Sequence, residues 1–214
     1  MAHRRRARPG RGRPRGPAPE GHACGVSTPK SRAARARPAR PSSCGRDAAF
    51  FTVGAQLAQV TGTTVTYVQN GTPWSSNAPR VPVPAPQVLI TTLGAGDELA
   101  VSVGIAVDPT PAVTRFTNSA SLPIQTLLTL MPAEGAHDQS VAGPGQAVAY
   151  AQALRNAVRE QLEMTPADHV HLFLAGPGGL ALLRGHRWNR VAPTVVDEDL
   201  GPGRGYVAAF AVAA

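Results

Sequence analysis

Hydrophobic positions along the chain fall into short blocks whose spacing alternates between the strand period and the helix period. Nearly unbroken apolar runs over 99–107, 124–130 and 170–175 predict strands that are covered on both faces. Between the last two runs, apolar residues recur every three or four positions from Val148 to Leu162, and charged residues take the other side, which predicts a long helix. Strands that alternate with helices indicate an α/β fold with a mostly parallel sheet and helices on both faces.

The remaining elements are shorter and depend on fewer residues. Helices are expected over 48–62, 108–116 and about 178–190, and strands over 63–68, 194–196 and 206–212, with the last strand at an edge of the sheet. The first of these helices depends on an apolar stripe that ends at Gly62 and consists of Phe50, Val53, Leu57 and Val60. Residues 69–87 carry five prolines, which predicts a long loop.

Residues 1–47 follow no period and differ in composition from the rest. Ala, Arg, Pro and Gly fill 33 of the first 46 positions. The segment holds 13 of the 21 basic residues and two acids, a net charge of +11, which leaves −3 for residues 48–214. Such a segment cannot bury enough apolar surface to offset its ordering entropy, so we expect a disordered leader and one domain over 48–214.

The leader has two interpretations. A basic arm could contact a nucleic-acid backbone without sequence preference. A solvated tail, or sequence translated from a misplaced start, is the favoured alternative, because the leader has no aromatic side chain to stack on bases.

Several classes of protein are excluded by composition. No run of 18 apolar residues could span a membrane, and no apolar stretch follows the first arginines as a secretory signal requires. Cys24 and Cys44 both lie in the leader, so neither a disulfide framework nor a cysteine zinc site supports the core. We therefore expect a cytoplasmic protein.

The most distinctive local feature is a predicted strand that runs into the turn Gly176-Pro177-Gly178-Gly179 and then into a helix. Glycines let the backbone approach a ligand closely, and free amides at a helix start suit a phosphate. Ligands of open α/β sheets gather at the carboxyl ends of the strands. The turn is therefore either a phosphate-binding element or a tight connection without a ligand, and the two alternatives stay open.

The same turn permits an enzymatic interpretation. Gly176 to Ala181 match the G-x-G-x-x-A fingerprint, and Asp197 or Glu198 follows where a ribose-binding acid belongs, so an oxidoreductase domain that binds NAD or NADP is the alternative. Pro177 weakens it, because proline has no amide to offer a phosphate. No Walker A or G-x-S-x-G motif and no carboxylate pair with catalytic spacing occurs, so no catalytic residue or cofactor is expected.

Four further residues are candidate ligand contacts, each with a structural alternative. Trp74 either stacks on a base or plugs the edge of the core. Ser140 is expected to cap a helix whose amides could face an anion. Asp108 and Thr110 stand at a predicted helix start, where free amides could meet phosphates.

Histidines and acids give weaker signals. His169 and His171 share one face of their strand and could join His137 and Asp138 around a metal, but nothing in the sequence fixes such a geometry, so no metal site is predicted. The acidic run 197–199 is expected to be a solvated charge cluster.

Taken together, blocks of the chain over roughly 48–214 resemble the SAVED family of bacterial antiphage defence sensors. The matching blocks are Tyr67–Gly71 with Trp74, Asp97–Val103, Leu127–Pro132, His171–Pro177, Leu180–Leu183 and Gly185–Asn189, followed by the acidic strand at Val196. The family usually has an aromatic residue before the acid of that strand, where Val196 precedes Asp197 here.

The resemblance implies a Rossmann-like, CARF-like domain that binds cyclic oligonucleotides and drives assembly and activation of a fused nuclease or protease effector. No effector precedes the domain, and the chain resembles the carboxyl-terminal half of a two-halved sensor. We therefore expect a non-enzymatic module that binds a cyclic oligonucleotide, oligomerises with it and acts on an effector missing from this chain. The alternatives are the NAD or NADP domain and a truncated, non-functional fragment with a nucleic-acid-binding tail.

The expected ligand contacts follow from this hypothesis. Ligand phosphates would meet the amides of Gly176, Gly178 and Gly179 and the helix start at Asp108 and Thr110. Trp74 and Ser140 would add stacking and polar contacts.

Overall fold

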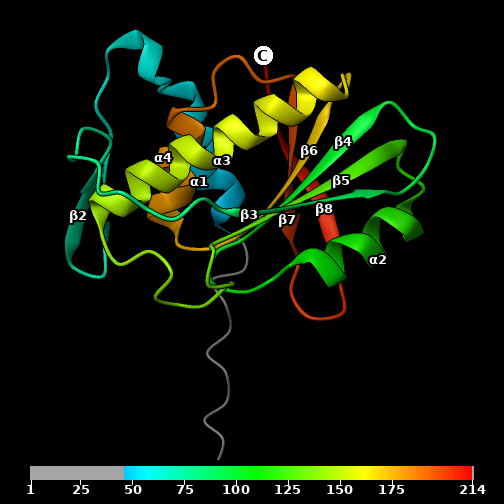
Figure 1. Cartoon of the computed structure of the whole chain (residues 1–214), viewed down its shortest axis with the longest axis horizontal. Helices are drawn as coiled ribbons and strands as arrows, with labels where there is room; N and C mark the ends of the chain where they lie inside the picture. The colour runs from blue at the N-terminus through cyan, green and yellow to red at the C-terminus, as the bar shows by residue number, and fades with distance from the viewer. Residues whose placement is uncertain (1–45, 214) are drawn as a thin grey trace, which may run out of the picture. The chain divides into compact units, whose positions relative to one another are not determined.

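The computed structural model describes residues 46–213 (Figure 1), and the expectations for the basic leader up to residue 45 lie outside the described residues. The helices are α1 (Asp47–Gln56), α2 (Thr110–Ala120), α3 (Pro144–Met164) and α4 (Gly178–His186), with a 3₁₀ turn at Gln59–Thr61. The strands are β1 (Thr66–Gln69), β2 (Thr72–Ser75), β3 (Gln87–Thr92), β4 (Glu98–Gly104), β5 (Ile124–Met131), β6 (Val170–Ala175), β7 (Thr194–Asp199) and β8 (Tyr206–Val212).

Six strands form one sheet in the order β3-β5-β4-β6-β7-β8. The four inner strands β4, β5, β6 and β7 are parallel, because a helix connects each of them to the next along the chain, whereas β3 and β8 run antiparallel at the two edges. β1 and β2 form a separate hairpin. The predicted α/β fold with a mostly parallel sheet, and the edge position of the last strand, are confirmed.

Helices cover both faces of the sheet. Figure 1 shows α1, α3 and α4 on one side and α2 on the other. The larger core packs α1, α3 and α4 on alternate residues of β4 and β6 such as Val101 and Leu172, and the smaller core packs α2 through Val113 on the intervening residues Ala100 and Phe173. Because β4 is buried along six of its seven residues, its apolar run is continuous rather than alternating.

Two glycines bring α1 and α4 into backbone contact. A side chain on Gly54 of α1 would overlap the carbonyl oxygen of Leu182, and one on Gly185 of α4 would overlap that of Phe51. The aromatic ring of Phe51 is fully buried beside this crossing and packs edge-on against Trp188, with ring centroids 5.2 Å apart. The lack of a side chain at Gly54 and at Gly185 therefore determines how closely α1 and α4 approach each other.

This contact corrects the predicted first helix. The expected stripe faces outward, since Val53, Leu57 and Val60 are all exposed, and the buried face consists of Ala48, Phe51 and Gly54. The helix ends at Gln56 rather than Gly62. On this face position 54 is a glycine, because α4 lies too close there for any side chain.

Two short elements were not predicted. The loop expected over 69–87 contains β2, which pairs with β1 across the turn Asn70-Gly71, where both residues have positive φ (51° and 80°). β3 is also new, and its six residues are all exposed. The helices predicted over 108–116 and about 178–190 correspond to α2 and α4, which end at Ala120 and His186 instead. No helix among the described residues is long and apolar enough to cross a membrane.

We expect Gly185→Ala to destabilise the fold by more than about 2 kcal/mol, because the new methyl group would collide with the α1 backbone. The sign of the change in the free energy of unfolding is diagnostic, since a glycine-to-alanine substitution inside a helix otherwise stabilises by roughly 0.5–1 kcal/mol. Urea unfolding followed by circular dichroism measures the change. Gly143→Ala is the matched control, because nothing lies within 4 Å of its added side chain and its extended backbone suits any residue. Equal stabilities for the two variants would contradict the contact.

Candidate functional site

The carboxyl ends of β4 and β6 meet at the point where the strand order reverses. β5 and β6 follow β4 in sequence but lie on opposite sides of it, and the chain leaves β4 toward α2 and β6 toward α4, on opposite faces of the sheet. Open α/β sheets bind ligands in the crevice at such a switch point. We call the segments that follow β4, β5 and β6, residues 105–109, 132–143 and 176–177, the carboxyl edge.

Backbone hydrogen bonds tie the carboxyl edge together. The amides of Ile105 and Ala106 donate to the carbonyl oxygen of Ala175, at 2.8 and 3.2 Å. The amide of His137 donates to the carbonyl oxygen of Ile105, at 2.9 Å. These hydrogen bonds therefore join the three segments of the carboxyl edge into one continuous rim.

A small pocket of about 10 Å³ lies between the ends of β4 and β6. Apolar and glycine residues of these strand ends form its wall, including Ile105 and Gly176, and two charged residues line it, Asp47 from the start of α1 and Arg184 from α4. A space of this size holds about one water molecule.

The two charged groups of the pocket are incompletely satisfied. Asp47 accepts a hydrogen bond from the Gly176 amide through Oδ2 (3.1 Å), but its Oδ1 has no partner in the described part of the chain. Arg184 is 2% exposed, and its Nε and Nη2 have no hydrogen-bond partner within residues 46–213. Its guanidinium lies 5.7 Å from the ring centroid of Trp188, a cation–π contact.

Burial dominates the protonation of this pair. Desolvation raises the pKa of Asp47 from 3.8 to about 7, with a further increase from Glu198, while the Gly176 hydrogen bond and Arg184 oppose it. Burial lowers the pKa of Arg184, and the charge of Asp47 opposes that change. Neither residue was a predicted site residue. The sequence signal was the single arginine in the apolar segment from Leu180 to Gly185, since an arginine there is buried with the helix.

The predicted glycine turn begins at this pocket, and side chains of the chain itself cover it. The amide of Gly179 donates to Oε1 of Gln69 at 3.2 Å. A side chain on Gly178 would meet the ring of Phe50, and one on Gly179 would meet Tyr67 and Trp74. A ligand could therefore reach the amides of Gly178 and Gly179 only if these side chains moved.

Trp74 belongs to β2 of the hairpin and is 4% exposed. Its ring packs in the larger core and closes the space beside the start of α4. In this arrangement Trp74 packs against the glycine turn at Gly179 and supports it.

Asp108 and Thr110 lie on the rim, at the start of α2. Asp108 Oδ1 accepts the Thr110 amide at 2.9 Å, so this acid occupies the first amide of α2 from the position before the N-cap residue Pro109. The Thr110 hydroxyl bonds the hydroxyl of Ser102 at 3.1 Å, which anchors α2 to β4. Asp108 is exposed and Thr110 half-buried.

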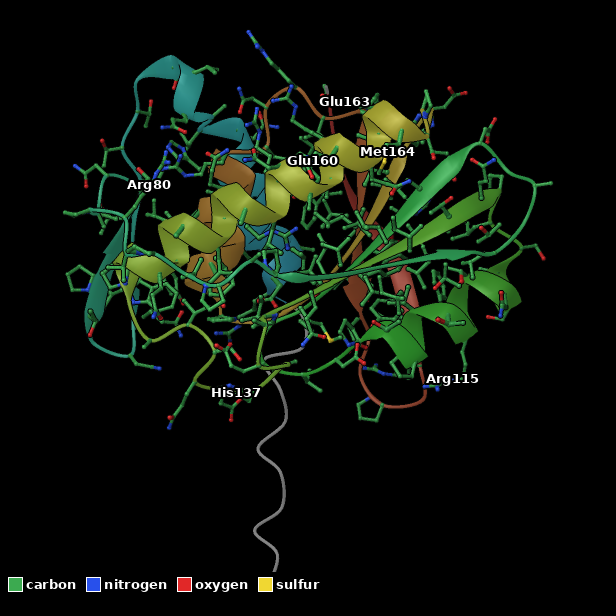
Figure 2. All side chains as sticks on the ribbon, in the orientation of Figure 1. Arg80, Arg115, His137, Glu160, Glu163 and Met164 are labelled. Atoms are coloured by element: carbon green, nitrogen blue, oxygen red, sulfur yellow. The ribbon has the colours of Figure 1, made fainter. Side chains whose placement is uncertain are left out.

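Ser140 lies on the same rim but caps no helix, because α3 begins only at Pro144. Its hydroxyl accepts the amide of His137 and donates to the carbonyl oxygen of Gly135, both at 3.1 Å, so it shapes the loop after β5. His137 lies at the outer end of this loop, far from Glu163 and Met164 at the opposite end of α3 (Figure 2). His137 is therefore separated from His169, which follows α3, and no metal-binding cluster of acids, cysteines and histidines occurs among residues 46–213.

A second charged cluster lies inside the sheet, on the face that α2 covers. His171 is buried and hydrogen-bonded by Asp197 through Nδ1 (2.9 Å) and by Glu98 through Nε2 (3.1 Å). His169 lies 3.6 Å from the same glutamate. Asp197 is 4% exposed, so the expectation that the acidic run is solvated is wrong for this residue. Held by His171, Asp197 also does not stand free as the ribose-binding acid of a dinucleotide site.

Asp197→Asn is expected to lower the pKa of His171. Burial alone would lower this pKa, but Asp197 and Glu98 outweigh burial and raise it above 6.5. The stabilisation from protonated His171 is therefore complete below pH 6.5 and is lost as the pH rises through the folded pKa. An NMR titration of the imidazole measures the change, with Asp199→Asn as the control because asparagine can keep the bond from the Gly201 amide. A wild-type midpoint below 6.5 would contradict this account.

Comparison with proteins of known structure finds chains that share this fold. The Acinetobacter baumannii Cap4 SAVED/CARF-domain containing receptor with the cyclic trinucleotide 3'3'3'-cAAA matches with a TM-score of 0.68 and 14% identity, over 79% of this chain and 37% of the receptor. The same receptor with 2'3'3'-cAAA matches with a TM-score of 0.67 and 13% identity, over the same shares of the two chains. The Moraxella osloensis Cap4 receptor matches with a TM-score of 0.54 and 17% identity, over 78% of this chain and 34% of that one.

These likenesses show that the chain shares the fold of the receptors, and the chain spans about a third of their length. No protein with curated annotation matches it. The family model described as "SMODS-associated and fused to various effectors sensor domain" matches residues 32–212, which is most of the chain. The chain therefore belongs to the SAVED family of sensor domains.

Proposed function

We propose that this domain is a sensor that binds a cyclic oligonucleotide at the carboxyl edge. The observation that carries the proposal is the pocket at the β4–β6 switch point, which is lined by the buried cation Arg184 and by Gly176 at the start of the carboxyl edge. A looped polyanion suits such a rim, since amides, hydroxyls and a guanidinium all donate hydrogen bonds to phosphate oxygens. Family membership, and solved receptors of the same fold that hold cyclic trinucleotides, support this class of ligand.

The proposed contacts divide into two groups. Gly176, Thr110, Ser140 and the α2 start capped by Asp108 lie on the rim and would face the ligand. Gly178 lies against Phe50 of α1, and Gly179 lies against Gln69 and Trp74 of the hairpin, so the ligand would reach these two amides only if those side chains moved. Without such movement they hold the shape of the rim.

The downstream role is also part of the proposal. The domain would act as a sensor rather than as an enzyme, and ligand binding would drive its oligomerisation and the activation of a nuclease or protease effector. The family description supports this role, because it names sensor domains that are fused to various effectors. The chain also covers only 37% of the solved receptor, so the receptor contains further parts beyond the matched domain.

Isothermal calorimetry against cyclic di-, tri- and tetranucleotides tests the ligand class. We expect saturable binding of at least one of them that weakens as salt rises, and no binding of NAD or NADP. If a folded sample binds none of these cyclic nucleotides, the sensor proposal is wrong.

A pair of matched variants locates the ligand. Asp108→Asn removes one negative charge from the rim while an amide oxygen can still cap Thr110, so we expect about two- to fivefold tighter binding at low salt. Asp168→Asn makes the same change on an exposed residue before β6, at the opposite edge of the sheet, and should leave affinity unchanged. Equal effects of the two substitutions would place the ligand elsewhere.

A further inference from the structure

The pocket at the switch point holds a cation without a full set of acceptors. Arg184 is 98% buried, yet Nε and Nη2 lack partners among the described residues. A buried guanidinium with open donors is costly, so the side chain needs an acceptor that the folded chain does not fully supply. The planar guanidinium can bind two oxygens of one phosphate at the same time.

The anion that now faces this cation fits poorly. Asp47 and Arg184 form no ion pair within 4 Å, and only one carboxylate oxygen of Asp47 has a hydrogen-bond partner. The charged form of Asp47 is disfavoured by burial and by Glu198 from β7, while Arg184 and the Gly176 amide favour it. The carboxylate therefore gains little by remaining in the pocket.

The pocket has room for about one water, so a phosphate enters only if the Asp47 side chain leaves. Asp47 is the first residue of α1 and is partly exposed, which allows its side chain to rotate outward. The helix itself is held against α4 by Gly54 and Gly185. The exchange thus needs a change of side-chain rotamer, not the release of a helix.

We propose that the Gly176 amide and the Arg184 guanidinium form a binding site for one phosphate group, which Asp47 occupies when no phosphate is bound. The site deepens the proposed sensor function and rests on it for the identity of the natural phosphate. Its donors are one backbone amide and the Nε and Nη2 groups of one guanidinium. Asp47 then acts as a competitor that sets the threshold for binding.

Asp47→Ala tests the site, with inorganic phosphate and a cyclic triadenylate as separate probes. The substitution removes the competing carboxylate, so we expect both probes to bind about tenfold more tightly than they bind the wild-type chain. Asp47→Asn keeps an acceptor for Gly176 without the charge and should give a smaller gain. Asp168→Asn, a matched loss of charge at the opposite edge, should give none. Calorimetry measures affinity, and circular dichroism checks that each variant is folded.

The outcomes separate the site from the ligand class. If the triadenylate binds the wild-type chain and Asp47→Ala leaves both affinities unchanged, the phosphate site is wrong and the sensor function stands. If no cyclic oligonucleotide binds but inorganic phosphate binds Asp47→Ala more tightly, the site stands and the ligand class is wrong. If neither probe binds any variant, both are overturned. Arg184→Lys in the Asp47→Ala background should abolish the gain, because lysine lacks the guanidinium donors.

Discussion

The contact between α1 and α4 fixes the geometry on which the functional edge depends. Gly54 and Gly185 let the two helix backbones meet, and this places the first residue of α1 over the end of β6. The amide of Ala48 donates to Oε2 of Glu198 at 3.2 Å, which ties the same helix start to β7. One close crossing of helices thereby determines which side chain faces the switch point.

The two buried charged clusters contrast in how well they are satisfied. His171 has a carboxylate on each ring nitrogen, so its positive charge is compensated from both sides of β6. Arg184 is more deeply buried and has open donors beside a single half-engaged carboxylate. Full compensation is what a structural ion pair requires, whereas incomplete compensation leaves binding capacity for a group that arrives from outside.

The sequence predicted the parts of the fold whose residues are buried in a regular pattern. The continuous apolar runs of β4, β5 and β6 were found because these strands are buried on both faces, and the stripe of α3 was found because one side of that helix packs in the larger core along its length. The buried face of α1 was missed, since Phe51 is the only one of its three residues with a strong hydrophobic signal. β3 was missed because neither of its faces is covered.

Prediction of the site stopped at a different limit. Position along the chain indicated that the Gly176 turn follows a strand, and the structure places it at the switch point. Partners far apart in sequence could not be found this way, since Asp47 meets Gly176 across 129 positions and Gln69 meets Gly179 across 110. These tertiary contacts decide which amides are already occupied.

The edge strand β3 could make self-association of this domain depend on protein concentration. β3 presents Val88, Leu89 and Ile90 about half exposed, and no charged or proline residue interrupts its six positions. Strands with these properties favour pairing with another chain through their free backbone groups. Association through that edge requires no nucleotide, so the stoichiometry of any assembly has to be measured at several dilutions before it is assigned to a ligand.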